Sequence, residues 1–156
     1  MARRVFFSFH YDNDIWRANQ VRMANVVAGP DRAGFFDHSE YDEAKKQGAE
    51  GIRRMINRHL KNTSVTVVLI GAETAGRPWV RYEVDKSIEQ GNGLLGIRIH
   101  HLKNQNGETS FFSGPTPRVP AGVEFPVYDW DGDLDRFRKA IEAAGKRSDA
   151  LRSRSR

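Results

Sequence analysis

Two residues in the middle of the chain, Trp79 and Glu83, have types and a spacing that could support chemistry. Residues four apart on an α-helix lie one above the other on the same face, so a carboxylate would stand beside a large flat aromatic ring. Such a pair suits a cationic or ring-shaped ligand, because the ring can stack while the carboxylate supplies negative charge. The spacing also fits an ordinary amphipathic helix, with Trp79 in the core and Glu83 in solvent. The pair alone leaves both interpretations open.

Several kinds of chemistry are excluded by residue types and motifs that the sequence lacks. The chain has no Cys, so thiol nucleophiles, disulfides and Cys-ligated metal sites are impossible. Neither the GxGxxG dinucleotide motif nor the P-loop motif occurs, so the usual phosphate cradles are missing. The five His residues form no HExxH or similar metal-binding pair. We therefore expect no metal site.

Short apolar runs alternate with segments of helical period along the chain. Five strands are expected, at residues 5–10, 34–37, 64–70, 94–99 and 125–128. Helices are expected from Asp12 or Asn13 to near Val27, over 41–60, from Pro78 to Gln90, and from Asp131 or Asp133 onward. This βαβα order predicts an α/β fold, a three-layer sandwich in which helices cover both faces of a mostly parallel five-stranded sheet.

The carboxyl ends of the strands are where a parallel sheet places its ligand site. The residues that directly follow the first three expected strands are therefore candidates: Phe9, His10 and Tyr11, then Asp37 and His38, then 71–77. His10 or Arg77 could meet a phosphate group, aided by the amino terminus of the helix that begins at Pro78. By residue type alone, Phe9 also fits core packing and His10 fits an ordinary surface position.

A loop rich in Pro and Gly is expected over residues 103–122. Loops of this length are uncommon and are either functional or disordered. The adjacent rings of Phe111 and Phe112 favour packing over disorder, and one interpretation is a cover over the ligand site.

The net charge of +5, from 25 Lys and Arg against 20 Asp and Glu, is concentrated at the carboxyl end. Residues 146–156 carry five basic groups and one acidic group, which leaves 20 basic and 19 acidic residues elsewhere. We therefore expect one domain over residues 1–145 and a basic, disordered tail over 146–156. The nearly neutral body favours a pocket for a small ligand, and a nucleic-acid partner, which would depend on the tail alone, is not expected.

No apolar run approaches the ~20 residues that a membrane-spanning helix needs. The amino-terminal sequence MARRVFFSFHYDND becomes charged after a short apolar stretch, so it does not have the pattern of a signal peptide. These features predict a soluble cytoplasmic protein with no membrane contact.

Two stretches carry a resemblance to a known family. RVFFSFHYDND resembles the opening strand and turn of TIR domains, in which Ser, an aromatic residue and a nearby Asp follow an apolar strand. RPWVRYEV resembles the TIR helix motif of Trp, three residues and Glu, at the expected distance along the chain. The detail HYDNDIWRANQVR is similar to the TIR-like proteins of bacterial Thoeris antiviral systems. The likeness covers residues 3–145 and implies a flavodoxin-like fold.

The resemblance also implies an activity and a site. Enzymatic TIR domains cleave NAD between nicotinamide and ribose, and Thoeris TIR proteins cyclise the remainder into an isomer of ADP-ribose. The catalytic glutamate of the family falls on Glu83, and NAD would be a substrate, so no cofactor is expected. The expected site therefore has Glu83 as its catalytic residue and substrate contacts from Phe9, His10, Trp79, Arg77 and Asp37.

Partners and alternative functions follow from the same comparison. A separate effector protein in the bacterial cytoplasm would receive the nucleotide product. The stretch DHSEYDEAKKQG lacks the signature by which adaptor TIR domains associate, so formation of a homo-oligomer is left open. One alternative is a non-catalytic TIR interaction module. Another is an enzyme similar to nucleoside 2-deoxyribosyltransferases, whose chemistry also uses a Glu on a related sheet.

Overall fold

The computed structural model describes residues 3–24 and 38–154. Its elements are, in chain order, β1 (Val5–Ser8), α1 (Tyr11–Ala24), α2 (His38–Lys46), α3 (Gly48–Leu60), β2 (Val65–Ile70), the short 3-10 helix η2 (Thr74–Gly76), α4 (Pro78–Glu89), β3 (Gly93–Arg98), β4 (Val127–Asp129) and α5 (Leu134–Arg154). Helical segments separate β1 from β2 and β2 from β3, as the hydrophobic pattern predicts, whereas β4 follows β3 with no helix between them.

The sheet is parallel throughout, with strand order β1-β2-β3-β4. Its central strand β2 has the continuous apolar and β-branched sequence VTVVLI and is buried along its whole length. Such a run is expected where helices cover both faces of a parallel sheet. The fifth expected strand, at residues 34–37, lies outside the described residues, and the other four expected strands are all present.

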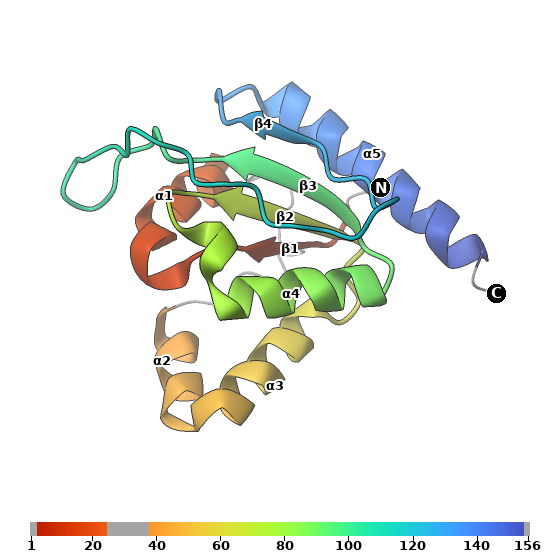
Figure 1. Cartoon of the computed structure of the whole chain (residues 1–156), viewed down its shortest axis with the longest axis horizontal. Coiled ribbons are helices and arrows are strands. Elements are labelled where there is room, and N and C mark those ends of the chain that lie inside the picture. Colours follow the sequence, from red (N-terminus) through yellow and green to blue (C-terminus); the bar gives the residue numbers. More distant parts are fainter. Residues whose placement is uncertain (1–2, 25–37, 155–156) are drawn as a thin grey trace.

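Helices cover both faces of the sheet, which confirms the predicted α/β class (Figure 1). Because side chains alternate along a strand, β2 presents Val68 and Ile70 to α4 on one face. On the other face, Val67 and Leu69 belong to a larger core that includes Phe137 of α5. None of the helices within 3–24 and 38–154 is long and apolar enough to span a membrane.

The segment 41–60, expected as one helix, is divided into α2 and α3. The chain turns at Gln47, and Gly48 has a φ of +75°, a conformation that favours glycine. At Gly51 a side chain would meet the carbonyl oxygen of Ala44, so the two helices approach closely after the turn. Hydrophobic periodicity missed this break because α2 and α3 both keep an apolar face.

The expectation of a disordered tail over 146–156 is wrong as far as Arg154, because α5 continues to that residue. Ser148 is fully buried and donates a hydrogen bond to the Gly91 carbonyl oxygen, 2.6 Å away. Arg152 donates to the carbonyl oxygen of Thr63, and Asp149 accepts from Arg3. Basic residues that the charge count assigned to a solvated tail therefore fix the helix to the sheet.

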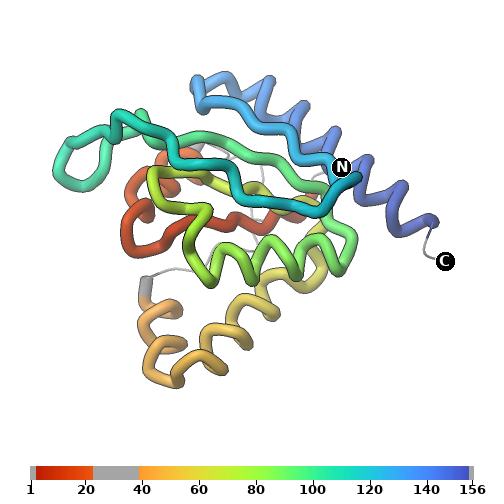
Figure 2. The backbone as a smooth tube through the Cα atoms, viewed as in Figure 1, coloured from red at the N-terminus to blue at the C-terminus, as the bar shows by residue number. Residues whose placement is uncertain are grey.

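The long connection between β3 and β4 passes over the α4 side of the sheet in its second half (Figure 2). Val119, Val123 and Phe125 pack there against the apolar cluster of β2 and α4. In its first half the rings of Phe111 and Phe112 are 89% and 72% exposed, so the expectation that they pack into the protein is wrong. This half is held by Arg17, which donates hydrogen bonds to the carbonyl oxygens of Leu102 and Glu108.

Candidate active site

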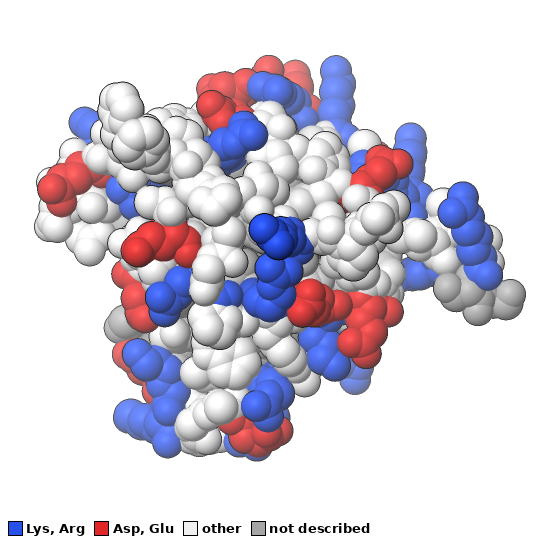
Figure 3. Space-filling view, viewed as in Figure 1, with Lys and Arg blue, Asp and Glu red and all other residues white. Residues whose placement is uncertain are grey.

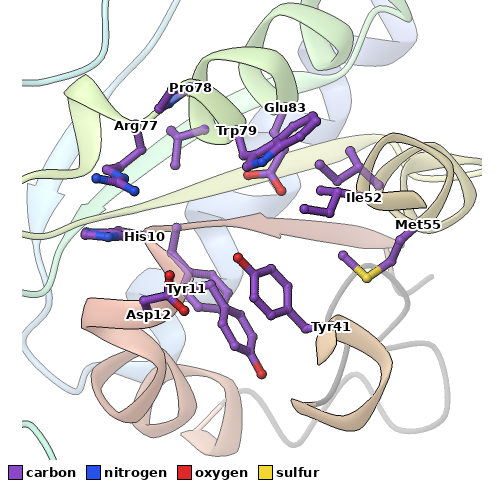
Figure 4. Close-up of a pocket in the computed structure, with 13 residues that line it drawn as sticks. His10, Tyr11, Asp12, Tyr41, Ile52, Met55, Arg77, Pro78, Trp79 and Glu83 are labelled. Atoms are coloured by element: carbon purple, nitrogen blue, oxygen red, sulfur yellow. The ribbon is translucent and has the colours of Figure 1, made fainter. Parts of the chain in front are cut away.

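A pocket opens at the carboxyl end of β1, between the first turn of α4 and the helices α2 and α3 (Figure 4). It encloses a cavity of about 50 Å³. Its lining comes from the turn after β1, from α2, from α3 and from the start of α4: Phe9, His10, Tyr11, Asp12, Tyr41, Ile52, Met55, Ile56, Arg77, Pro78, Trp79, Val80 and Glu83. The topology therefore brings together residues that are up to 74 positions apart in the sequence, the separation of Phe9 and Glu83.

Glu83 is the buried acid of this pocket. It lies on the inner face of α4 and is only 4% exposed. The hydroxyl group of Ser8, the last residue of β1, donates a hydrogen bond of 2.6 Å to Glu83 Oε1. Burial raises the pKa of the Glu83 carboxyl to about 8, although the Ser8 hydrogen bond opposes the shift. No lysine or arginine among the described residues forms an ion pair with Glu83, so the empty pocket favours the protonated acid at neutral pH.

Aromatic rings form the walls of the pocket around this acid. Trp79 lies one helical turn before Glu83, and Figure 4 shows the two side chains side by side above the cavity. Opposite them, the rings of Phe9, Tyr11 and Tyr41 form a continuous stack, with centroids 5.8 Å apart in the first pair and 3.9 Å in the second. The pocket can therefore offer flat apolar surfaces to a ligand that contains rings.

Polar groups lie at the side of the pocket where β1 ends and α4 begins. Arg77 is exposed and directly precedes α4, whose first residue is Pro78, so it lies at the end of the helix where the N–H groups of the first turn have no partner within the helix. His10 is 9% exposed, and burial followed by the charge of Arg77 lowers its pKa. The imidazole is therefore neutral at pH 7. This side can hold an anionic group against the positive end of the helix dipole.

The structure brings together five of the six residues expected at the site. Phe9, His10, Arg77, Trp79 and Glu83 all line the pocket. The sixth, Asp37, lies outside the described residues. The amphipathic-helix alternative, with Glu83 in solvent, does not hold, because the carboxyl group is buried in the pocket.

Sequence reasoning missed Ser8, Tyr41 and the apolar residues of α3 that complete the pocket. A signal for Ser8 was present, because Ser8 directly precedes Phe9 at the carboxyl end of the first strand, where the ligand site of a parallel sheet is expected. Tyr41 had no such signal, since its position depends on the turn between α2 and α3.

Metal binding finds no support in the described ranges 3–24 and 38–154, where no group of three His, Asp or Glu residues could hold an ion. The face of the molecule in view in Figure 3 mixes Lys and Arg with Asp and Glu and shows no continuous basic area.

A parallel sheet, helices on both faces and a buried glutamate one turn after a tryptophan define a TIR-like domain. The chain matches, over residues 6–104, the family model described as "Thoeris protein ThsB, TIR-like domain", and it belongs to this family. It is 44% identical over 141 residues to a protein of Bacillus cereus (strain MSX-D12) named "Putative cyclic ADP-D-ribose synthase ThsB1". This match covers 85% of the present chain and 73% of the relative. The TIR resemblance predicted from the two sequence motifs is thereby confirmed.

Proposed function

We propose that this protein cleaves NAD at the bond between nicotinamide and ribose and closes the remainder into a cyclic ADP-ribose isomer. The observation that carries the proposal is Glu83, a buried carboxyl group with no cationic partner among the described residues, in a pocket walled by aromatic rings. The name of the Bacillus cereus relative supports the same reaction. NAD is consumed as a substrate in this reaction and is not a cofactor.

The chemistry needs one carboxylate. When the bond between ribose C1′ and the nicotinamide nitrogen breaks, its electron pair stays on nitrogen and nicotinamide leaves as a neutral molecule. No general acid is required for that departure. The ribose becomes an oxocarbenium-like cation, which the negatively charged Glu83 stabilises by its position in a buried site. A nucleophilic atom at the adenosine end then attacks C1′ and closes the ring, whereas attack by water gives linear ADP-ribose.

The substrate itself supplies the charge that ionises Glu83. A pKa of about 8 keeps the acid largely protonated in the empty pocket at neutral pH. The nicotinamide ring of NAD carries a positive charge, and an opposite charge nearby lowers the pKa of a carboxyl group. Entry of the correct ring therefore converts Glu83 into its active form, and a neutral ring does not.

Other residues bind parts of NAD in this proposal. Trp79 and Phe9 stack against its rings, and His10 and Arg77 meet the diphosphate beside the amino terminus of α4. Asp37 remains a predicted substrate contact.

The cyclic product would act in antiviral defence as a signal to a separate effector protein in the bacterial cytoplasm. In this proposal an infection trigger or self-association opens the pocket before the protein becomes active.

The test is a comparison of nicotinamide release by the parent protein, Glu83→Gln and Glu89→Gln. Glu89 lies at the exposed end of the same helix, so its variant is the matched control. Chromatography of nucleotides would follow nicotinamide, linear ADP-ribose and cyclic isomers, in buffer and in lysates of infected and uninfected cells. We expect Glu83→Gln to lose at least about 100-fold in rate and Glu89→Gln to keep the parent rate.

Full activity of a folded Glu83→Gln protein would contradict the proposed role. The two alternatives give different outcomes in the same experiment. A non-catalytic interaction module would release no nicotinamide under any condition, and a deoxyribosyltransferase-like enzyme would exchange bases between deoxynucleosides instead.

A further inference from the structure

The ring of Tyr41 occupies the pocket in the manner of a bound ligand. It enters from α2 and lies almost parallel to the Tyr11 ring, with an interplanar angle of 18° and centroids 3.9 Å apart. In Figure 4 its hydroxyl group points into the cavity, toward the side occupied by Glu83. Stacked aromatic pairs normally have centroids about 4.5–7 Å apart, so this pair is unusually close and face to face.

The remaining cavity is too small for any ring of NAD. It measures about 50 Å³. By comparison, an engineered dry cavity that binds benzene, a molecule of similar size to one such ring, measures about 150 Å³. The pocket as it stands has space for a water molecule or two, although its walls are the flat surfaces that a heteroaromatic ring requires. Some side chain must therefore leave before a substrate can enter.

Tyr41 belongs to α2, a described helix that does not pack extensively on the sheet. Phe9 and Tyr11 follow directly from β1, and Trp79 belongs to α4, which packs on the sheet. Among the described elements, α2 packs extensively only against α3. It joins α3 through the turn at Gln47 and Gly48 and through Glu40, which accepts a hydrogen bond from Arg58. Rotation of α2 about this turn would withdraw Tyr41 and leave the sheet unchanged.

We propose that Tyr41 holds the place of a flat ring of the substrate, so that a ligand enters by exchanging its own ring for Tyr41 in the stack on Tyr11. This inference rests on the proposed function for the identity of the substrate, NAD. The exchange makes Tyr41 a competitor of the ligand and gives the pocket a preference for flat heteroaromatic rings, because only such rings restore the lost stacking. The empty protein is held closed by the same contact.

The test measures the binding of free nicotinamide and of adenosine by calorimetry to the parent, Tyr41→Phe, Tyr41→Ala and Tyr41→Leu. Phenylalanine keeps the ring and is the matched control, so its affinity should equal that of the parent. Removal of the ring should tighten binding of at least one probe by about 3- to 10-fold, the value of one stacked pair. Tyr41→Leu keeps most of the apolar volume in α2, and its affinity for the two probes is the test if Tyr41→Ala folds poorly. Circular dichroism verifies the fold of each variant.

Equal or weaker binding of both probes to folded Tyr41→Ala or Tyr41→Leu would overturn the inference, because Tyr41 would then be a wall of the binding site. The free rings keep this result separate from the proposed function. Tighter ring binding without NAD cleavage would support the exchange while the NAD reaction fails. NAD cleavage by the parent without tighter ring binding in the variants would support the reaction while the exchange fails.

Discussion

Two carboxyl groups are buried in the part of the chain that the structure describes, those of Glu83 and Asp14, and their surroundings are opposite. Their residues are 4% and 0% exposed, and burial raises the pKa of both. Asp14 Oδ1 accepts a hydrogen bond of 2.9 Å from the guanidinium group of Arg17, which opposes the shift. Glu83 accepts a hydrogen bond from the hydroxyl group of Ser8 and forms no ion pair with a basic side chain among the described residues. Asp14 is paired with Arg17 within the fold, whereas Glu83 lies beside a cavity.

The ion pair with Arg17 gives Asp14 a structural role. Its partner Arg17 also donates to the carbonyl oxygens of Leu102 and Glu108 and so fixes the first half of the loop after β3. The backbone at Gly71 closes over Asp14, since a Cβ atom there would lie 2.2 Å from Asp14 Oδ2. No ligand can reach this carboxylate. A buried acid points to a functional site when a pocket, and no basic side chain, faces it.

Replacing each acid by its amide gives the largest contrast between them. Asp14→Asn removes the charge that compensates the buried Arg17, and we expect the free energy of unfolding to fall by about 3 kcal/mol. Glu83→Gln replaces a largely neutral acid by a neutral group of the same shape, so it should change stability little at pH 5. Urea unfolding of both variants at pH 5, 7 and 9 would measure these differences.

The pH dependence has a definite sign. The folded pKa of Glu83, about 8, lies above the unfolded value of 4.5, so the parent loses stability as the pH rises between these values. Glu83→Gln cannot lose a proton and should become more stable than the parent from pH 5 to pH 8, with no further gain above. A constant difference between the two proteins across this range would show that Glu83 is not a buried neutral acid.

A smaller effect is expected for the hydroxyl group that contacts Glu83. Ser8→Ala removes a hydrogen bond that favours the ionised carboxyl group, so nicotinamide release should fall by about 10-fold at pH 7. The acid limb of the kcat/KM profile should also move to higher pH, because the pKa of Glu83 rises further.

Ser87→Ala is the matched control for this variant. Ser87 is equally buried, and its hydroxyl group donates to the backbone oxygen of Glu83, 2.7 Å away. It should lower stability without moving the acid limb. If the acid limb shifts equally in both variants, or in neither, the hydroxyl group of Ser8 does not control the pKa of Glu83.

The sheet and most of the site residues could be predicted from the sequence, because both depend on local patterns. The run VTVVLI predicts a buried strand, and the spacing of Trp79 and Glu83 places them on one helix face whatever the tertiary structure. The role of Asp14 could not be read in this way, since a first-turn aspartate is usually a solvated charge. Its burial depends on the distant backbone at Gly71, and its partner Arg17 is held by Leu102, 85 residues away from Arg17. The order of residues 146–154 likewise depends on distant carbonyl groups that composition does not reveal.

The central claim is that Glu83 is an uncharged buried acid that a cationic ring converts into a carboxylate. The most direct measurement is the ¹³C NMR titration of side-chain carboxyl groups labelled in glutamate, with Glu83→Gln to assign the signal, in the presence and absence of a non-cleavable NAD analogue with a charged pyridinium ring. We predict a signal that titrates near pH 8 in the empty protein and at clearly lower pH in the complex. A titration near the ordinary pKa of glutamate in the empty protein, or one that the analogue leaves unchanged, would contradict the claim.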